Sequence, residues 1–194
     1  MNFIATNLNG AYIIEPQVFA DERGYFFESY HQAKFAQNGI TATFVQDNES
    51  RSTYGVMRGL HAQAGGFAQA KLIRVLSGTI LDIGVDVRLD SPTFGQHVAT
   101  ELSADNRRML YLPRGFLHGF AVLSLEAVVA YKCDNFWHQE AELTICLSDP
   151  DLALTWPFAP AQAIISKKDQ LGISLRSWLK QQHLIPRYRP DLAS

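Results

Sequence analysis

The chain has 194 residues, which suits one domain with a short appendage. Hydrophobic residues make up 47% of the sequence, charged residues 19%, and the formal net charge is -2. This composition argues against a disordered chain and provides enough apolar residues for a core. No basic run or lysine-rich segment occurs, so we expect no nucleic-acid partner.

The N-terminal residues 1–9 lack a positive flank and a long apolar run, so we expect no signal peptide. We also expect no membrane partner, because no stretch approaches the length of a membrane helix. Cys133 and Cys146 are the only cysteines and do not form a CxxC pair. We expect both thiols to be reduced and buried, as is usual in a cytoplasmic protein.

Helical signals are few. Ser29 is a candidate N-cap for a short helix through Phe35, and Asn38-Gly39 fits its end. Near the C-terminus, apolar residues recur at helical spacing from Leu175 to Leu179, and prolines at 186 and 190 indicate a tail. We therefore expect a main domain over residues 1–170, and a C-terminal helix and tail over 171–194.

The middle of the chain has the pattern of short β-strands. Apolar and polar residues alternate from Leu81 to Arg88, which is the period of a strand with one buried face. Further strands are expected over residues 71–75, 96–102, 108–112, 119–123 and 127–133. Many short strands at regular spacing predict an all-β fold, a cupin-type jelly-roll barrel with short peripheral helices. An up-and-down barrel is less favoured, because the strands are short and irregularly linked.

A cation and an imidazole lie close together in Arg58-Gly59-Leu60-His61. Their separation of three positions places Arg58 and His61 on opposite faces of an ideal strand. Gly59 permits a bulge that could re-aim one of them. Taken alone, so short a motif fits a surface arginine and a hydrogen-bonded histidine better than a functional site.

Lys71 begins the next expected strand. A lysine that enters a barrel is costly unless it meets a negative group. Its side chain fits equally a strand end that faces solvent and a cation aimed at a phosphate or an enolate.

The PxGxxH motif of residues 113–118 is a tight turn that delivers His118 into a strand. A zinc or iron site needs at least three converging ligands. His61-Ala62-Gln63 lacks the second imidazole of an HxH pair, so we expect no metal site. A hydrogen-bonded core histidine explains His118 as well as a functional role does.

Two later segments hold further candidates. Tyr131 and Cys133 share one face of a strand, and the Tyr131 phenol can exchange a proton if it is desolvated; aromatic packing is the alternative. Residues 166–169 fit an exposed charged turn, or else Asp169 is a carboxylate that orients a histidine.

Together these segments resemble the dTDP-4-dehydrorhamnose 3,5-epimerase family from about Tyr12 to Asp169. Several separate motifs occur in the same order as in that family. They are Asp21 to Tyr30, Phe44 to Asn48, Met57 to His61, Ser91 to Gln96, Pro113 to Phe120 and Ser166 to Asp169.

The resemblance implies a homodimeric epimerase that needs no cofactor and no metal. Its substrate would be a dTDP-linked 4-keto-6-deoxy sugar, inverted at C3 and C5 through an enolate. His61 corresponds to the base, Asp169 to the carboxylate paired with it, and Tyr131 to the acid on the opposite ring face. Lys71 and His118 correspond to residues around the substrate carbonyl.

The resemblance also implies a set of residues that hold the rest of the substrate, in part across the dimer interface. These are Arg23, Tyr25, Glu28, Gln46, Asn48, Arg58, Trp137 and Lys168. Two positions depart from the family pattern. Trp137 stands where a tyrosine is common, and Ala62 stands where an aromatic residue is common, which would enlarge the pocket.

Three other functions stay open at this point. The protein could be a single-carbon epimerase or ketoisomerase on a related dTDP-4-keto sugar. It could be a metal-dependent cupin, or a barrel that binds sugar nucleotides without catalysis.

Overall fold

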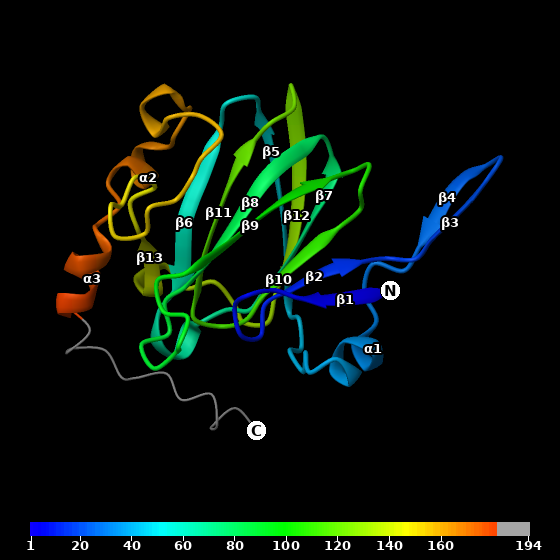
Figure 1. Ribbon diagram of the computed structural model, residues 1–194, viewed down its shortest axis with the longest axis horizontal. Coiled ribbons are helices and arrows are strands. Elements are labelled where there is room, and N and C mark those ends of the chain that lie inside the picture. The colour runs from blue at the N-terminus through cyan, green and yellow to red at the C-terminus, as the bar shows by residue number, and fades with distance from the viewer. Residues whose placement is uncertain (182–194) are drawn as a thin grey trace.

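Two facing antiparallel sheets form the body of the molecule in the computed structural model, which describes residues 1–181 (Figure 1). In spatial order, the six-stranded sheet contains β1 (Asn2–Ala5), β2 (Tyr12–Glu15), β10 (Met109–Leu112), β7 (Lys71–Ser77), β12 (Glu126–Cys133) and β5 (Gln46–Thr53). The five-stranded sheet contains β13 (Glu142–Thr144), β6 (Met57–Gln63), β11 (Phe116–Val122), β8 (Thr79–Asp86) and β9 (His97–Ser103). The all-β jelly roll predicted from the sequence is confirmed.

The remaining elements lie outside these two sheets. A hairpin of β3 (Val18–Asp21) and β4 (Gly24–Phe27) stands clear of the barrel in Figure 1. The helices are α1 (Gln32–Gln37), α2 (Lys167–Gln170) and α3 (Leu175–Gln181). Short 3-10 turns cover Gly65–Phe67, Gln139–Ala141 and Pro160–Gln162.

The main core fills part of the space between the two sheets. Ile73 of β7 and Phe120 of β11 belong to the same buried cluster, although they come from opposite sheets. The sheets approach closely at Gly84, where an added Cβ would lie 2.3 Å from Leu112. A larger residue at position 84 would therefore displace the Leu112 side chain.

A second cluster covers the outer face of the five-stranded sheet. Leu60, Val85 and Leu117 point to this face and pack with Leu175 and Trp178 of α3. The C-terminal helix predicted from residue 175 is confirmed, and it packs against the barrel. The tail expected around Pro186 and Pro190 lies outside the described residues.

Strand β8 differs from its sequence pattern. The expectation of one buried face was wrong, because both faces are covered. Ile83 and Val85 pack outward against the C-terminal segment, whereas Asp82 and Asp86 point into the barrel and are 0% exposed. Alternation shows that two faces differ in polarity, but it does not show what lies over the polar face.

Helix α1 does not begin with a Ser29 cap. Its N-cap is His31, and no side chain caps it. Phe35 is fully buried and makes edge-on ring contacts with Phe3 and Tyr30. Packing of Phe35 therefore positions the helix, while the expected end at Gly39 is confirmed by its φ of +81°.

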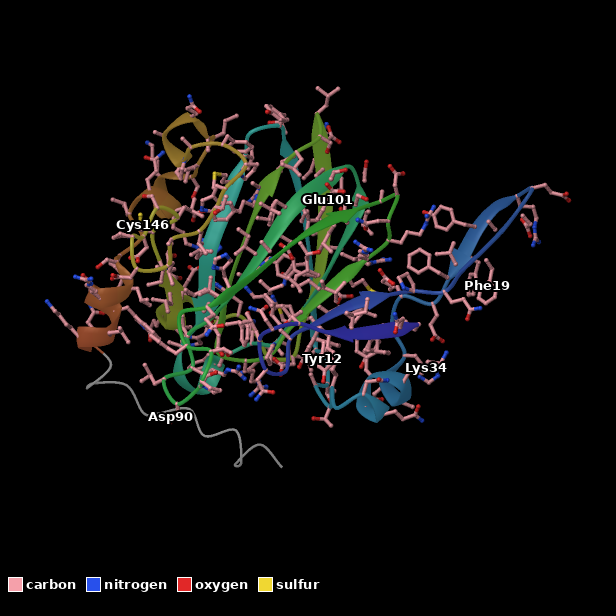
Figure 2. The ribbon with its side chains drawn as sticks, in the orientation of Figure 1. Tyr12, Phe19, Lys34, Asp90, Glu101 and Cys146 are labelled. Atoms are coloured by element: carbon pink, nitrogen blue, oxygen red, sulfur yellow. The ribbon has the colours of Figure 1, made fainter. Side chains whose placement is uncertain are left out.

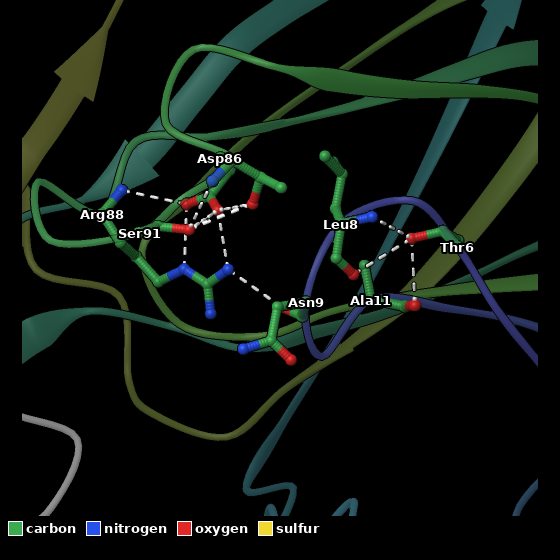
Figure 3. A network of polar contacts seen from close by, with 8 residues as sticks. Thr6, Leu8, Asn9, Ala11, Asp86, Arg88 and Ser91 are labelled. Carbon is green, nitrogen blue, oxygen red and sulfur yellow. Dashed lines mark hydrogen bonds and ion pairs between the residues drawn. The ribbon is translucent and has the colours of Figure 1, made fainter.

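A polar network ties the loop after β8 to the N-terminal loop (Figure 3). The buried Asp86 carboxylate accepts hydrogen bonds from Arg88 Nε at 2.8 Å and Thr93 Oγ1 at 2.6 Å, and another from Ser91. Arg88 Nη2 also donates to the Asn9 carbonyl at 2.9 Å. The Arg88 guanidinium thus joins the Asp86 carboxylate to a segment far away in the chain.

Both cysteines are free thiols, but only one is buried as expected. Cys133 is 1% exposed, whereas Cys146 is partly exposed. None of the helices within residues 1–181 combines the length and the apolar character needed to cross a lipid bilayer.

Candidate active site

A cavity of about 250 Å³ opens inside the barrel between the two sheets. Nine residues selected from the sequence line it: Gln46, Asn48, Arg58, His61, Lys71, His118, Tyr131, Trp137 and Lys168. They come from β5, β6, β7, β11, β12 and two segments that follow the strands. The barrel therefore brings together side chains that are scattered over more than 120 positions of the chain.

A bulge in β6 directs two of these side chains into the cavity. In the pairing with β11, His61 lies opposite His118 and Arg58 lies opposite Phe120, so two steps on one strand match three on the other. Gly59 has a φ of +126°, and a Cβ there would lie 2.6 Å from the Gly119 backbone. Only glycine fits this position, and the structure has the bulge that Gly59 permits.

His61 is paired with a buried carboxylate. His61 Nε2 lies 2.8 Å from Asp169 Oδ1, and the Gly59 backbone N–H donates to Asp169 Oδ2 at 3.2 Å. Burial disfavours the charged form of Asp169, but these hydrogen bonds outweigh it and hold the pKa of Asp169 below its ordinary value. The ionised carboxylate keeps a proton on Nε2 and leaves Nδ1 as the basic nitrogen.

Helix α2 places Asp169 for this contact. The helix is a single turn, and the Ser166 hydroxyl caps it by accepting the Asp169 backbone N–H at 3.1 Å. Asp169 is only 6% exposed. The sequence left open whether residues 166–169 form an exposed charged turn or supply a carboxylate that faces a histidine. In the structure, Asp169 faces His61.

Tyr131 and Lys71 occupy the six-stranded side of the cavity. The Lys71 ammonium lies 5.8 Å from the centre of the Tyr131 ring, and the ring centroids of Tyr131 and His118 are 6.3 Å apart. Burial raises the pKa of Tyr131 and lowers the pKa of Lys71. The cavity thus holds a protonated phenol and a poorly solvated lysine amine close together.

His118 is held by a second carboxylate that the sequence did not single out. His118 Nε2 lies 2.7 Å from Asp82 Oδ1, and both side chains are buried. The only sequence signal for Asp82 was its place on the polar face of β8. Its partner could not be identified, because the two residues are 36 positions apart.

A short chain of hydrogen bonds orders the amides on β5. The Trp137 backbone N–H donates to Gln46 Oε1 at 2.9 Å, and Gln46 Nε2 donates to Asn48 Oδ1 at 3.0 Å. Asn48 Nδ2 then points to Cys133 Sγ at 3.7 Å. Near the other end of β5, the Ser52 Oγ accepts a hydrogen bond from Arg58 Nε of β6 at 3.0 Å. These contacts leave polar groups oriented toward the cavity.

Lys168 lies at the rim and forms an ion pair with Glu142 of β13. Glu142 also lines the cavity, and sequence reasoning missed it. The three-residue strand β13 is too short to give a periodic signal, so no pattern identified this carboxylate.

Three predicted substrate residues do not reach this cavity. Arg23 pairs with Asp21, Tyr25 stacks on Phe27 of the same hairpin, and Glu28 pairs with Lys34. Arg23, Tyr25 and Glu28 are not among the residues that line the cavity of their own chain.

Ala62 lies between the cavity and the outer cluster. It borders the cavity, but it is 9% exposed and packs in the outer cluster beside Leu143. Because His61 points into the barrel, its neighbour on the strand points away from it.

Within residues 1–181, no three His, Cys, Asp or Glu side chains converge as metal ligands would. His61 and His118 each face a carboxylate instead. The groups present can exchange protons, and Lys71 can stabilise a developing negative charge.

Fold and cavity together define a cupin-like jelly-roll protein with an acid–base pocket. A family model described as dTDP-4-dehydrorhamnose 3,5-epimerase matches residues 5–177. A protein of that name from Methanothermobacter thermautotrophicus is 48% identical over 175 residues, which cover 90% of this chain and 94% of the relative. One from Escherichia coli is 46% identical over 171 residues, which cover 88% and 92%.

A solved structure agrees with these sequence matches. The dTDP-6-deoxy-D-glucose-3,5-epimerase of Legionella pneumophila, in complex with dTDP-4-keto-L-rhamnose, superposes with a TM-score of 0.90 at 46% identity. The match covers 97% of this chain and 98% of that one. The chain belongs to the dTDP-4-dehydrorhamnose 3,5-epimerase family, and the resemblance found in the sequence is confirmed.

Proposed function

We propose that this protein inverts C3 and C5 of dTDP-4-dehydro-6-deoxyglucose and so produces dTDP-4-dehydrorhamnose. One observation carries the proposal: His61, which is paired with Asp169, and the Tyr131 phenol line the same cavity. The names of the relatives support this activity, and the bound keto sugar of the Legionella pneumophila protein supports the substrate class.

The first step is removal of a proton from a carbon next to the ketone. The C4 carbonyl acidifies the hydrogens on C3 and C5, because the resulting charge moves onto the carbonyl oxygen as an enolate. His61 Nδ1 is the base. Asp169 holds the imidazole in the correct tautomer and stabilises the imidazolium ion that forms.

The second step is return of a proton to the opposite face of the ring. Tyr131 is the acid, and its raised pKa keeps the phenol protonated until the enolate forms. Lys71 lies beside the phenol and balances the negative charge of the enolate oxygen, with His118 next to it. The substrate serves as its own electron sink, because its C4 carbonyl takes up the charge left on the carbon.

The polar lining holds the nucleotide part of the substrate. Arg58 supplies a cation for the diphosphate, and the ordered amides of Gln46 and Asn48 supply hydrogen bonds. Trp137 is 51% exposed at the rim and offers an aromatic surface, and Lys168 adds a second cation.

We also propose a homodimer in which the hairpin β3–β4 serves the cavity of a second copy. Phe19, Tyr25 and Phe26 on this hairpin are 56%, 58% and 70% exposed, and Figure 2 shows Phe19 on the hairpin, clear of the barrel. Exposed aromatic residues in one place are typical of an interface. In this arrangement Arg23 and Glu28 would contact the substrate bound in the cavity of the other subunit.

Subunit complementation tests the dimer. His61→Ala has an inactive cavity with an intact hairpin, and Arg23→Ala has the reverse. We expect each variant alone to lose most activity and the co-expressed pair to regain part of it in mixed dimers. Light scattering that gives a monomer, or the absence of complementation, would contradict the proposal.

A cytoplasmic location is proposed as well. Its support is that Cys133 and Cys146 are free thiols, which is usual in a reducing compartment.

Deuterium counting tests the main proposal. Purified protein is incubated with dTDP-4-dehydro-6-deoxyglucose in heavy water, and the product is examined by NMR. We expect deuterium at both C3 and C5 with inversion of both carbons, and neither change with His61→Ala. Inversion at a single carbon identifies a single-carbon epimerase, and a changed carbonyl position identifies a ketoisomerase. If the protein binds dTDP but exchanges no hydrogen, it is an inactive barrel. If a chelator abolishes the activity and added metal restores it, the protein is a metal-dependent cupin.

A further inference from the structure

If the proposed function is correct, one base and one acid carry out two inversions, and the first inversion leaves both groups in the wrong protonation state for the second. Each inversion moves a proton from carbon to His61 and another from Tyr131 to carbon. His61 is then an imidazolium ion and Tyr131 is a phenolate. Neither group can act on the second carbon until His61 loses its proton and Tyr131 regains one.

The proton that His61 takes from carbon cannot reach solvent through Asp169, because that side of the pair is buried. Asp169 is 6% exposed, one of its oxygens faces His61, and the other accepts the Gly59 N–H. The His61 side chain is 29% exposed and lines the cavity. The proton must therefore leave through the cavity.

Glu142 lies where it could receive that proton. In the antiparallel pairing of β13 with β6, Glu142 is opposite Gln63 and Thr144 is opposite His61. Paired residues share a face of the sheet, and so do residues two apart on one strand, so Glu142 is the diagonal neighbour of His61. Such neighbours have Cβ atoms roughly 7–8 Å apart or less, within reach of a long side chain.

Three further features fit this role. Among residues 1–181, Glu142 is the only carboxylate that lines the cavity. Its side chain is 22% exposed and reaches solvent, unlike that of Asp169 at 4%. Its ion pair with Lys168 is itself at the surface, and such pairs contribute little free energy and break readily.

A carboxylate in this cavity is unfavourable for binding an anionic substrate, so its presence suggests a separate function. The cavity takes a diphosphate-linked ligand in the proposed function, and Arg58, Lys71 and Lys168 supply the positive charge for it. A negative group among them weakens anion binding through Coulomb repulsion.

We propose that Glu142 is the proton-relay residue that returns His61 to its neutral form between the two inversions. The imidazolium N–H bond breaks, and the proton passes, directly or through one water molecule, to a Glu142 oxygen. Glu142 then gives it to solvent. The Tyr131 phenolate takes a proton from water, so the two groups regain their starting states and no proton is gained or lost overall.

A single-turnover experiment with Glu142→Gln tests the relay. Enzyme in excess over substrate is mixed in heavy water, quenched at short times, and inversion at each carbon is followed by NMR and mass spectrometry. We expect one carbon to invert at the wild-type rate, because the resting enzyme is already correctly protonated. The second carbon should invert roughly 10²-fold more slowly, since it waits for the proton to leave.

Rescue separates a relay from a structural effect. Added formate should accelerate only the second inversion of Glu142→Gln, and Glu142→Asp should regain part of the rate. Lys168→Met breaks the same ion pair but keeps the carboxylate. We expect it to weaken substrate binding while the two inversions stay coupled.

The relay is wrong if Glu142→Gln inverts both carbons at the wild-type rates, or if both inversions slow equally and formate has no effect. The wild-type arm tests the proposed function separately. If wild-type protein fails to invert both carbons in one turnover, the proposed function fails, whatever the variant does.

Discussion

His118 Nε2 and Asp82 Oδ1 lie 2.7 Å apart inside the barrel, where the two side chains are 7% and 0% exposed. Asp82 Oδ2 has no hydrogen-bond partner among the described residues. The carboxylate nevertheless acts on Lys71 across the cavity. Burial lowers the pKa of Lys71, and the charge of Asp82 is among the effects that oppose this shift.

Replacing Asp82 should therefore change the pH dependence of catalysis. Asp82→Asn keeps the size of the side chain but removes its charge, so the pKa of Lys71 falls further. The Lys71 ammonium is lost as pH rises through its folded-state pKa, and this loss then begins at lower pH. We expect the alkaline limb of the kcat–pH profile to move to lower pH. An unchanged limb would show that Asp82 does not influence the catalytic cation.

Removing the partner of His61 should impair the base without unfolding the protein. Asp169→Asn loses the negative charge that fixes the tautomer of His61, and we expect kcat to fall roughly 10²–10⁴-fold. Asp151→Asn is the matched control, because it breaks the exposed contact with Arg176 far from the cavity. The control should keep the wild-type kcat. Steady-state kinetics and thermal unfolding check both, and an active Asp169→Asn would exclude this residue from the mechanism.

Removing the acid should separate exchange from inversion. Tyr131→Phe keeps the ring in place but has no proton to deliver to the far face. His61 can still remove a proton and return a deuteron to the same face. We expect deuterium in the recovered substrate without epimerised product, as seen by NMR in heavy water. Epimerisation at the wild-type rate would mean that another group is the acid.

The polar network of Asp86 makes a prediction about stability. Asp86→Ala leaves Arg88, Ser91 and Thr93 without their common acceptor. We expect the free energy of unfolding to fall by roughly 3–5 kcal/mol and Tm to fall on the order of 10 °C. Asp86 does not line the catalytic cavity, so the folded variant should keep its kcat at low temperature. A loss below about 1 kcal/mol would show that the network is not coupled to folding.

The same network predicts an acid-dependent loss of stability. Burial disfavours the charge on Asp86, but the hydrogen bonds from Arg88, Ser91 and Thr93 outweigh it, and the pKa of Asp86 lies below its ordinary value of 3.8. A carboxylate with a depressed folded-state pKa stabilises the protein fully above its unfolded-state pKa. The contribution is lost as pH falls through the folded-state value. Urea unfolding should therefore give a constant difference between wild type and Asp86→Asn above about pH 5, and a shrinking one below pH 3.8.

Much of the strand pattern could be read from the sequence, because alternation and turn residues are local signals. Gly78 lies at the turn between β7 and β8 with a φ of +79°, a conformation that glycine adopts readily. Helix α1 was harder, because Phe35 positions it through contacts with Phe3, which is more than 30 positions away. The sequence analysis missed Glu142, because its proximity to His61 depends on the pairing of β13 with β6.

The sequence by itself determined the fold class, the possibility of a bulge at Gly59 and the residue types needed for proton transfer. These depend on the period of a strand, on the conformations open to glycine and on the chemistry of histidine and tyrosine. Only the tertiary structure decided that His61 meets Asp169, 108 positions later, and that the polar face of β8 points into the barrel. It also decided that Arg23 and Glu28 stay away from the cavity of their own chain. Such contacts arise when the two sheets pack, and no local pattern records which faces will meet.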